Sequence, residues 1–130
     1  MTLRLPLLTL ACAAALLGAA CRLTEPTPEF LVQLEVAPSP PEAGRPAAVS
    51  LKLIDFVASK PLSGARVQLE ANMTHPGMTP VFAEAKEFEP GRYRADLEFT
   101  MAGDWVVIVH AALPDGRKIE RQFDVKGVAD

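Results

Sequence analysis

Two methionines and a histidine lie close together in the segment NMTHPGM. Its Pro76-Gly77 dipeptide suits the two central positions of a type II turn, the second of which needs a positive φ angle. Such a turn would bring the α-carbons of His75 and Met78 to within about 7 Å of each other. Thioether and imidazole groups are ligands that Cu(I) accepts, and a thioether needs no deprotonation before it binds. The spacing therefore predicts a Cu(I) site formed by Met73, His75 and Met78.

A packing role explains the same side chains. In the alternating pattern of residues 67–73, Met73 falls on the same face as the apolar residues before it, so it also fits the end of a core-facing row. Met78 fits an adaptable gap-filler, and His75 a solvated side chain. Met101 and His110 are further candidate ligands if the strand ends converge; otherwise Met101 ends a core row and His110 is a half-buried, hydrogen-bonded histidine. On the residues alone, both interpretations stay open.

The elements that must position this loop are short β-strands. Apolar and polar residues alternate with period two, and Pro/Gly turns separate the runs at intervals of about ten residues. Seven strands are predicted, around residues 30–36, 49–53, 67–71, 81–88, 93–99, 105–113 and 118–125. This pattern, without helical periodicity, indicates an all-β fold, a seven-stranded immunoglobulin-like β-sandwich. Because the cysteine pair of antibody domains is absent, Trp105 is expected to pack on aliphatic partners.

The first twenty residues have the layout of a cleaved secretory signal peptide. Arg4 supplies the positive charge, residues 5–17 form an apolar run, and small residues lead to Cys21. The run is short for a membrane span, and a retained membrane segment is the alternative. The segment LLGAAC resembles the lipobox of bacterial lipoproteins, although Gly18 stands where that family usually has Leu. We therefore expect cleavage before a lipidated Cys21.

These features divide the chain into three segments: a signal peptide at 1–20, a lipidated cysteine and flexible tether at 21–29, and one β-sandwich domain at 30–130. The tether RLTEPTPE has two prolines and no periodicity. One cysteine remains after cleavage, so the domain has no internal disulfide and depends on its core. The mature part holds all 16 acidic residues and 12 of the 13 basic ones, a net charge of −4. With this negative net charge, we expect no basic surface of the kind that binds nucleic acid.

No motif for catalysis is present in the sequence. There is no nucleophile elbow, C-x-x-C pair, phosphate-binding glycine loop or H-E-x-x-H helix. We expect no catalytic residue and no enzyme. The expected location is the cell envelope, periplasmic or at the cell surface, with a membrane bound through the lipid anchor.

Two segments, KPLSGARVQLEANMTHPGM and FEPGRYRADLEFTMAGDWVVIVHAALPDG, together resemble the YtkA-like domain, which is related to FixH-type proteins. The resemblance covers about residues 30 to 126. It implies an immunoglobulin-like sandwich in an exported or membrane-attached protein, with roles in copper handling or the assembly of respiratory oxidases. The family loop has two methionines followed closely by histidine, whereas the order here is Met73, His75, Met78. FixH-type members carry a membrane helix where this chain has a cleavable signal, so a direct role in oxidase assembly does not carry over.

The two functional hypotheses therefore belong to different classes. In the first, the protein binds Cu(I) for copper handling or metalloprotein assembly and meets a metalloprotein or envelope-protein partner. In the second, it is a structural or protein-interaction module of the cell envelope without a metal site.

Overall fold

The computed structural model describes residues 29–130, so the predicted signal peptide, Cys21 and most of the tether lie outside the described residues. This part contains strands and no helix, and hence no helix able to cross a membrane. The strands are β1 (Phe30–Ala37), β2 (Pro46–Asp55), β3 (Lys60–Pro61), β4 (Arg66–Met73), β5 (Val81–Glu89), β6 (Arg92–Glu98), β7 (Gly103–Ala112) and β8 (Lys118–Val128). The all-β prediction is confirmed. The short β3 lies between the predicted strands at 49–53 and 67–71, where the alternating pattern indicates no strand.

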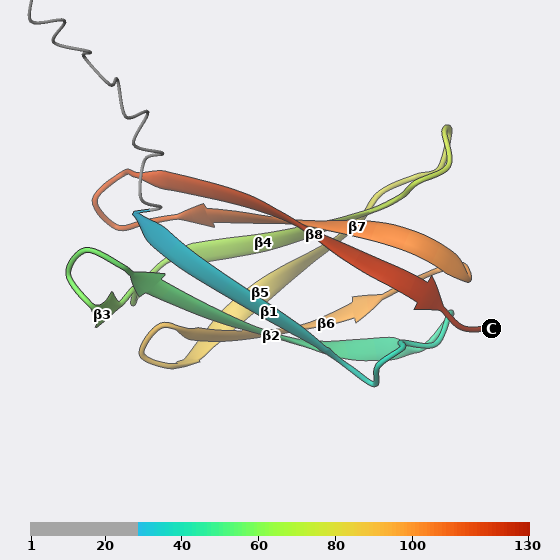
Figure 1. Cartoon of the computed structure of the whole chain (residues 1–130), viewed down its shortest axis with the longest axis horizontal. Coiled ribbons are helices and arrows are strands. Elements are labelled where there is room, and N and C mark those ends of the chain that lie inside the picture. The colour runs from blue at the N-terminus through green and yellow to red at the C-terminus, as the bar shows by residue number, and fades with distance from the viewer. Residues whose placement is uncertain (1–28) are drawn as a thin grey trace, which may run out of the picture.

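The strands pair in the order β1-β2-β6-β5-β4-β7-β8, with β3 attached to β2, and all these pairings are antiparallel. β5 belongs to two layers because residues 81–85 pair with β4 and residues 86–89 pair with β6. β1, β2 and β6 thus form one layer and β4, β7 and β8 the other (Figure 1). The path nearly closes on itself, since Ala43 and Pro41 exchange backbone hydrogen bonds with Ala129 after β8.

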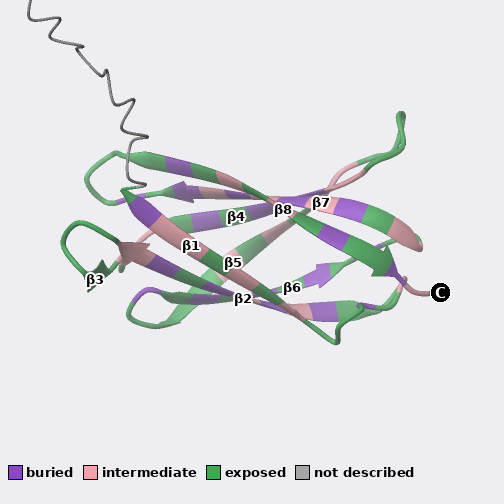
Figure 2. Ribbon diagram, viewed as in Figure 1, coloured by how far each residue is buried: buried purple, intermediate pink, exposed green. Residues whose placement is uncertain are grey.

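The predicted core-facing rows are buried between these layers. Tyr93, Ala95, Leu97 and Phe99 are all 5 % exposed or less, and buried and exposed residues alternate along β6 (Figure 2). The same alternation buries the predicted rows of β2 and β4. β1 differs: only Phe30 is buried, because β1 ends the strand order and has a neighbour on one side alone. Among residues 29–130, twenty apolar residues are buried.

Trp105 packs on an aromatic residue, so the prediction of aliphatic partners alone is wrong. Its ring meets Phe99 edge to face, with ring centroids 5.4 Å apart and an interplanar angle of 73°. This arrangement suits the quadrupoles of two aromatic rings. The β6–β7 connection turns the chain back at this point and brings the last residue of the Tyr93 row against the start of β7. The indole Nε1–H donates to the carbonyl oxygen of Met101 at 2.9 Å, which satisfies a polar group that would otherwise be buried alone.

Tyr93 connects β6 to the segment that follows β3. Its hydroxyl donates to the carbonyl oxygen of Leu62 at 2.7 Å and accepts from the backbone N–H of Ala65 at 3.0 Å. Burial raises the pKa of Tyr93 to about 12, so the phenol keeps its proton and can donate. These two bonds fix the loop through which the chain passes from one layer to the other.

Candidate functional site

The loop from Thr74 to Pro80 connects β4 to β5 and extends away from the two layers (Figure 1). The φ angle of Gly77 is +82°, as a type II turn with Pro76 before it requires. Both His75 and Met78 are exposed, and the exposed fraction of Met78 is 39 %. The turn therefore presents an imidazole and a thioether to solvent.

Met73 lies at the base of this loop, at the edge of the core. It is partly buried, packs against the core residues, and is the register partner of Trp105. Its terminal methyl carbon is so close to Gly103 that a Cβ on that glycine would lie 3.3 Å away. A packing role for this residue is thus realised in the structure. The contact also means that its thioether lies against the beginning of β7.

Backbone hydrogen bonds hold the base of the loop against β7. The N–H and the hydroxyl of Thr74 both donate to the carbonyl oxygen of Asp104, at 3.3 and 3.4 Å. The carboxylate of Asp104 accepts from the N–H of Gly127 in β8 at 3.0 Å. Asp104 therefore connects the loop base to two strands, while the loop tip stays in solvent.

Met101 is brought to the same corner by the β6–β7 connection. Its side chain is 48 % exposed, so the prediction that it packs as the end of a core row is wrong; its backbone carbonyl accepts the Trp105 indole bond. Trp105 thus has Met73 as its register partner and Met101 as its hydrogen-bond acceptor. All three methionines after Met1 consequently lie at one end of the domain, two of them with exposed side chains. We call this end, with Met73, Met78 and Met101, the methionine corner.

The structure does not bring His110 to this corner. Trp105, the partner of Met73, lies five residues before His110 on β7, a separation of roughly 17 Å at about 3.4 Å per residue. The Nε2 atom of His110 is 2.9 Å from a carboxylate oxygen of Glu70, and its Nδ1 atom is 3.6 Å from Glu120. His110 is thus a part-buried, hydrogen-bonded histidine, in line with the packing interpretation and outside the ligand set.

The carboxylate of Glu70 also accepts a hydrogen bond from the side-chain amide of Asn72 at 3.1 Å. The bonds from Asn72 and then from His110 lower the pKa of Glu70 below its ordinary value of 4.5. Both donors favour the ionised carboxylate. This polar cluster lies on the outer face of β4 and β7 and is separate from the methionine corner.

Within residues 29–130, no three His, Cys, Asp or Glu side chains are grouped so that they could hold a metal ion. A hard-ligand site for zinc or calcium is thus missing from the described part of the chain. The donors at the loop are of another kind, thioether sulfur and imidazole nitrogen. Soft ligands of this type suit Cu(I).

A family model described as YtkA-like matches residues 29–110. The matched span runs from the start of β1 to His110 in β7, and it includes the loop, Met101 and Trp105. A comparison with curated proteins finds no match. Because the model covers well over half of the sequence, the chain belongs to the YtkA-like family.

Proposed function

We propose that this protein is an exported, lipid-anchored and non-enzymatic β-sandwich protein that binds Cu(I). Met73, His75 and Met78 are the ligands, and Met101 is the candidate for a further one. Copper handling or the maturation of a metalloprotein is the role that this chemistry serves. The proposal rests chiefly on one observation: every methionine of the described residues lies at the same end of the domain, beside the exposed His75.

The exposure of two thioethers supports this reading. Large apolar side chains at the surface are common singly, but Met78 and Met101 occur in adjacent connections whose bases meet at Trp105. A methionine is flexible and carries a polarizable sulfur, so its side chain can adapt to a soft ion. Neither the thioethers nor a neutral imidazole must lose a proton to bind.

The position of the loop suits a protein held at a membrane. β1 begins at the end of the domain opposite the β4–β5 loop (Figure 1). If Cys21 is lipidated and residues 21–29 act as a tether, the methionine corner faces away from the anchor. It could then meet a metalloprotein or another envelope protein. The cleaved signal at residues 1–20 and the location in the cell envelope belong to the same proposal.

We further assign the domain to the immunoglobulin-like class. Seven main strands form layers of β1-β2-β6 and β4-β7-β8, and the fifth strand is shared between them. This order corresponds to the A-B-E-D and C-F-G sheets of constant-type immunoglobulin domains. The relation to FixH-type proteins remains part of the proposal, without the membrane helix that those proteins carry.

The test is a Cu(I) titration of the full chain in a neutral detergent, against a competing chromophoric chelator. Cys12 and Cys21 are replaced by serine, because free thiolates would bind the same ion. We expect one-to-one binding, weakened at least about tenfold by His75→Ala and by the double variant Met73→Leu/Met78→Leu. Leucine keeps the volume of methionine, so packing at Met73 is retained.

His110→Ala is the matched control, since it removes the other histidine of the chain. Its Cu(I) affinity should equal that of the parent chain. A parent chain that takes no Cu(I) from the chelator would refute the metal site. Equal losses in His75→Ala and His110→Ala would refute its location.

The alternative is an interaction module of the cell envelope, and one observation favours it. β1 and β8 are the two ends of the strand order, and a depression of about 520 Å³ lies between them. On its β1 side Leu34 and Val36 are core-facing but only partly buried. An extended segment of a partner could add to such an edge through backbone hydrogen bonds. Failure of the copper titration would make this the working hypothesis.

A further inference from the structure

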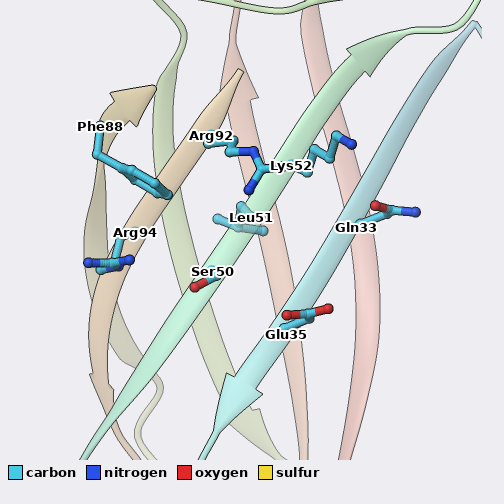
Figure 3. A pocket seen from close by; sticks show the side chains of 8 residues that line it. All are labelled: Gln33, Glu35, Ser50, Leu51, Lys52, Phe88, Arg92 and Arg94. Atoms are coloured by element: carbon cyan, nitrogen blue, oxygen red, sulfur yellow. The ribbon is translucent and has the colours of Figure 1, made fainter. Parts of the chain in front are cut away.

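A second concave surface lies on the outer face of the layer formed by β1, β2 and β6, away from the methionine corner. It is a depression of about 340 Å³. Ser50 of β2 lies near its middle, with Arg92 and Arg94 of β6 on one side and Glu35 of β1 on the other (Figure 3). Its volume is at the lower end of the range of about 300–1,000 Å³ that is usual for small-molecule sites.

The strand register places like charges directly opposite each other at this surface. Lys52 pairs with Arg92 across β2 and β6, and both line the depression together with Arg94. Lys86, the partner of Arg94 across β5 and β6, lies outside this lining. Directly opposed like charges destabilise a sheet. The chain as a whole is acidic, with 16 acidic and 13 basic residues, so three neighbouring cations in one depression are not a consequence of its composition. Local conflicts of this kind are expected at functional sites.

Carboxylates of the domain pair with only one of these three cations. Within the described residues, Arg92 has one ion pair, to Glu89 at 3.6 Å, and Lys52 and Arg94 have none. The positive charge at the surface is therefore available to a ligand.

One arginine is already held in place. The guanidinium carbon of Arg94 lies 4.6 Å from the centre of the Phe88 ring, a distance typical of cation–π contact. Stacking fixes the plane of the guanidinium and leaves the N–H groups at its edge for acceptors. Ser50, opposite Arg94 in the register, adds a hydroxyl donor.

We propose that this depression binds a compact oxyanion with two or more negative charges, carried by phosphate or by several carboxylates. A multivalent anion can be shared by Lys52, Arg92 and Arg94, whereas a ligand with one charge would offset only part of the repulsion among these three cations. Arginine pairs well with either group because its fork of donors matches their oxygens. Glu35 on the opposite side repels further oxygens and accepts hydrogen bonds, so it favours a ligand that carries hydroxyl groups on that side.

The experiment is isothermal titration calorimetry of the full chain in a neutral detergent, at low ionic strength, with pyrophosphate and citrate as the two probes. We expect one-to-one binding of at least one probe, weakened about tenfold or more in the double variant Arg92→Gln/Arg94→Gln. Arg66→Gln is the matched control: Arg66 is an exposed strand arginine of the other layer and, like Arg94, has no ion pair within residues 29–130. Tighter binding of pyrophosphate assigns a phosphate ligand, and tighter binding of citrate a carboxylate one.

Thermal unfolding followed by circular dichroism separates loss of the site from loss of the fold. Without a probe, Arg92→Gln/Arg94→Gln should unfold at the same temperature as the parent chain or higher, because opposed like charges have been removed. With a probe, the parent chain and Arg66→Gln should gain stability and the double variant should not. The proposal is overturned if neither probe binds, or if Arg66→Gln weakens binding as much as the double variant. It is also overturned if sodium chloride, added to the same ionic strength as the probe solution, abolishes binding of the probe.

Discussion

Gly91 offers a sharp test of how β3 is held in the fold. It lies between β5 and β6 with a φ angle of +73°, a left-handed conformation in which side chains are strained. A Cβ added here would lie 2.6 Å from the Cβ of Pro61 and 2.8 Å from the carbonyl oxygen of Leu53. The carbonyl of Gly91 also accepts a hydrogen bond from the N–H of Leu53 at 2.8 Å. The surrounding atoms are backbone and a proline ring, so they cannot move aside easily.

Gly91→Ala should therefore be costly for two separable reasons. The left-handed conformation costs an alanine about 1–2 kcal/mol. Overpacking adds about 1–3 kcal/mol, so the free energy of unfolding should fall by about 2–5 kcal/mol. Gly44→Ala is the matched control, since its φ angle is +75° and a Cβ there would meet nothing within 4 Å. It should lose only the conformational part, about 1–2 kcal/mol.

The assay is urea unfolding of residues 29–130, the part of the chain that the structure describes. Trp105 is the single tryptophan and is 1 % exposed, so its fluorescence reports loss of the core directly. The slope against urea should be unchanged, since the surface exposed on unfolding is the same. If the free energy of unfolding falls by the same amount in Gly91→Ala and Gly44→Ala, within about 0.5 kcal/mol, the steric argument is refuted.

Two further changes test the polar contacts of the domain. Tyr93→Phe leaves the N–H of Ala65 and the carbonyl of Leu62 without their partner, so unfolding free energy should fall by about 1–3 kcal/mol in the same urea assay; an unchanged value would show that water replaces the hydroxyl. Glu70 has a lowered pKa in the folded state, so its contribution is present above its ordinary pKa of 4.5 and is lost as the pH falls through the lower, folded value. Glu70→Gln should therefore flatten the decline of stability on acidification, measured by urea titrations at several pH values, and an identical decline in both proteins would contradict this.

Much of the fold could be predicted because strand formation leaves a local mark. Side chains alternate between the two faces of a strand, so rows such as Tyr93 to Phe99 identify both the element and its buried side. The turn at Pro76-Gly77 could be predicted for the same reason, because the positive φ angle of Gly77 follows from the Pro-Gly dipeptide itself. The two-residue strand β3 carries no such pattern, because Lys60 and Pro61 become a strand only through pairing with the end of β2.

The composition of the sites depends on contacts between distant segments. The sequence by itself determined the β-class, the buried rows, the exposed Pro-Gly turn and the soft donor types of the loop. Only the tertiary structure decided that Met101 shares a corner with Met73, that His110 bonds Glu70 instead, and that Trp105 meets Phe99. The cationic depression likewise could not be predicted from the sequence, because Lys52 and the two arginines become neighbours only through the strand register. Periodicity is set within one strand, whereas register and the meeting of loops are set by how strands pair across the chain.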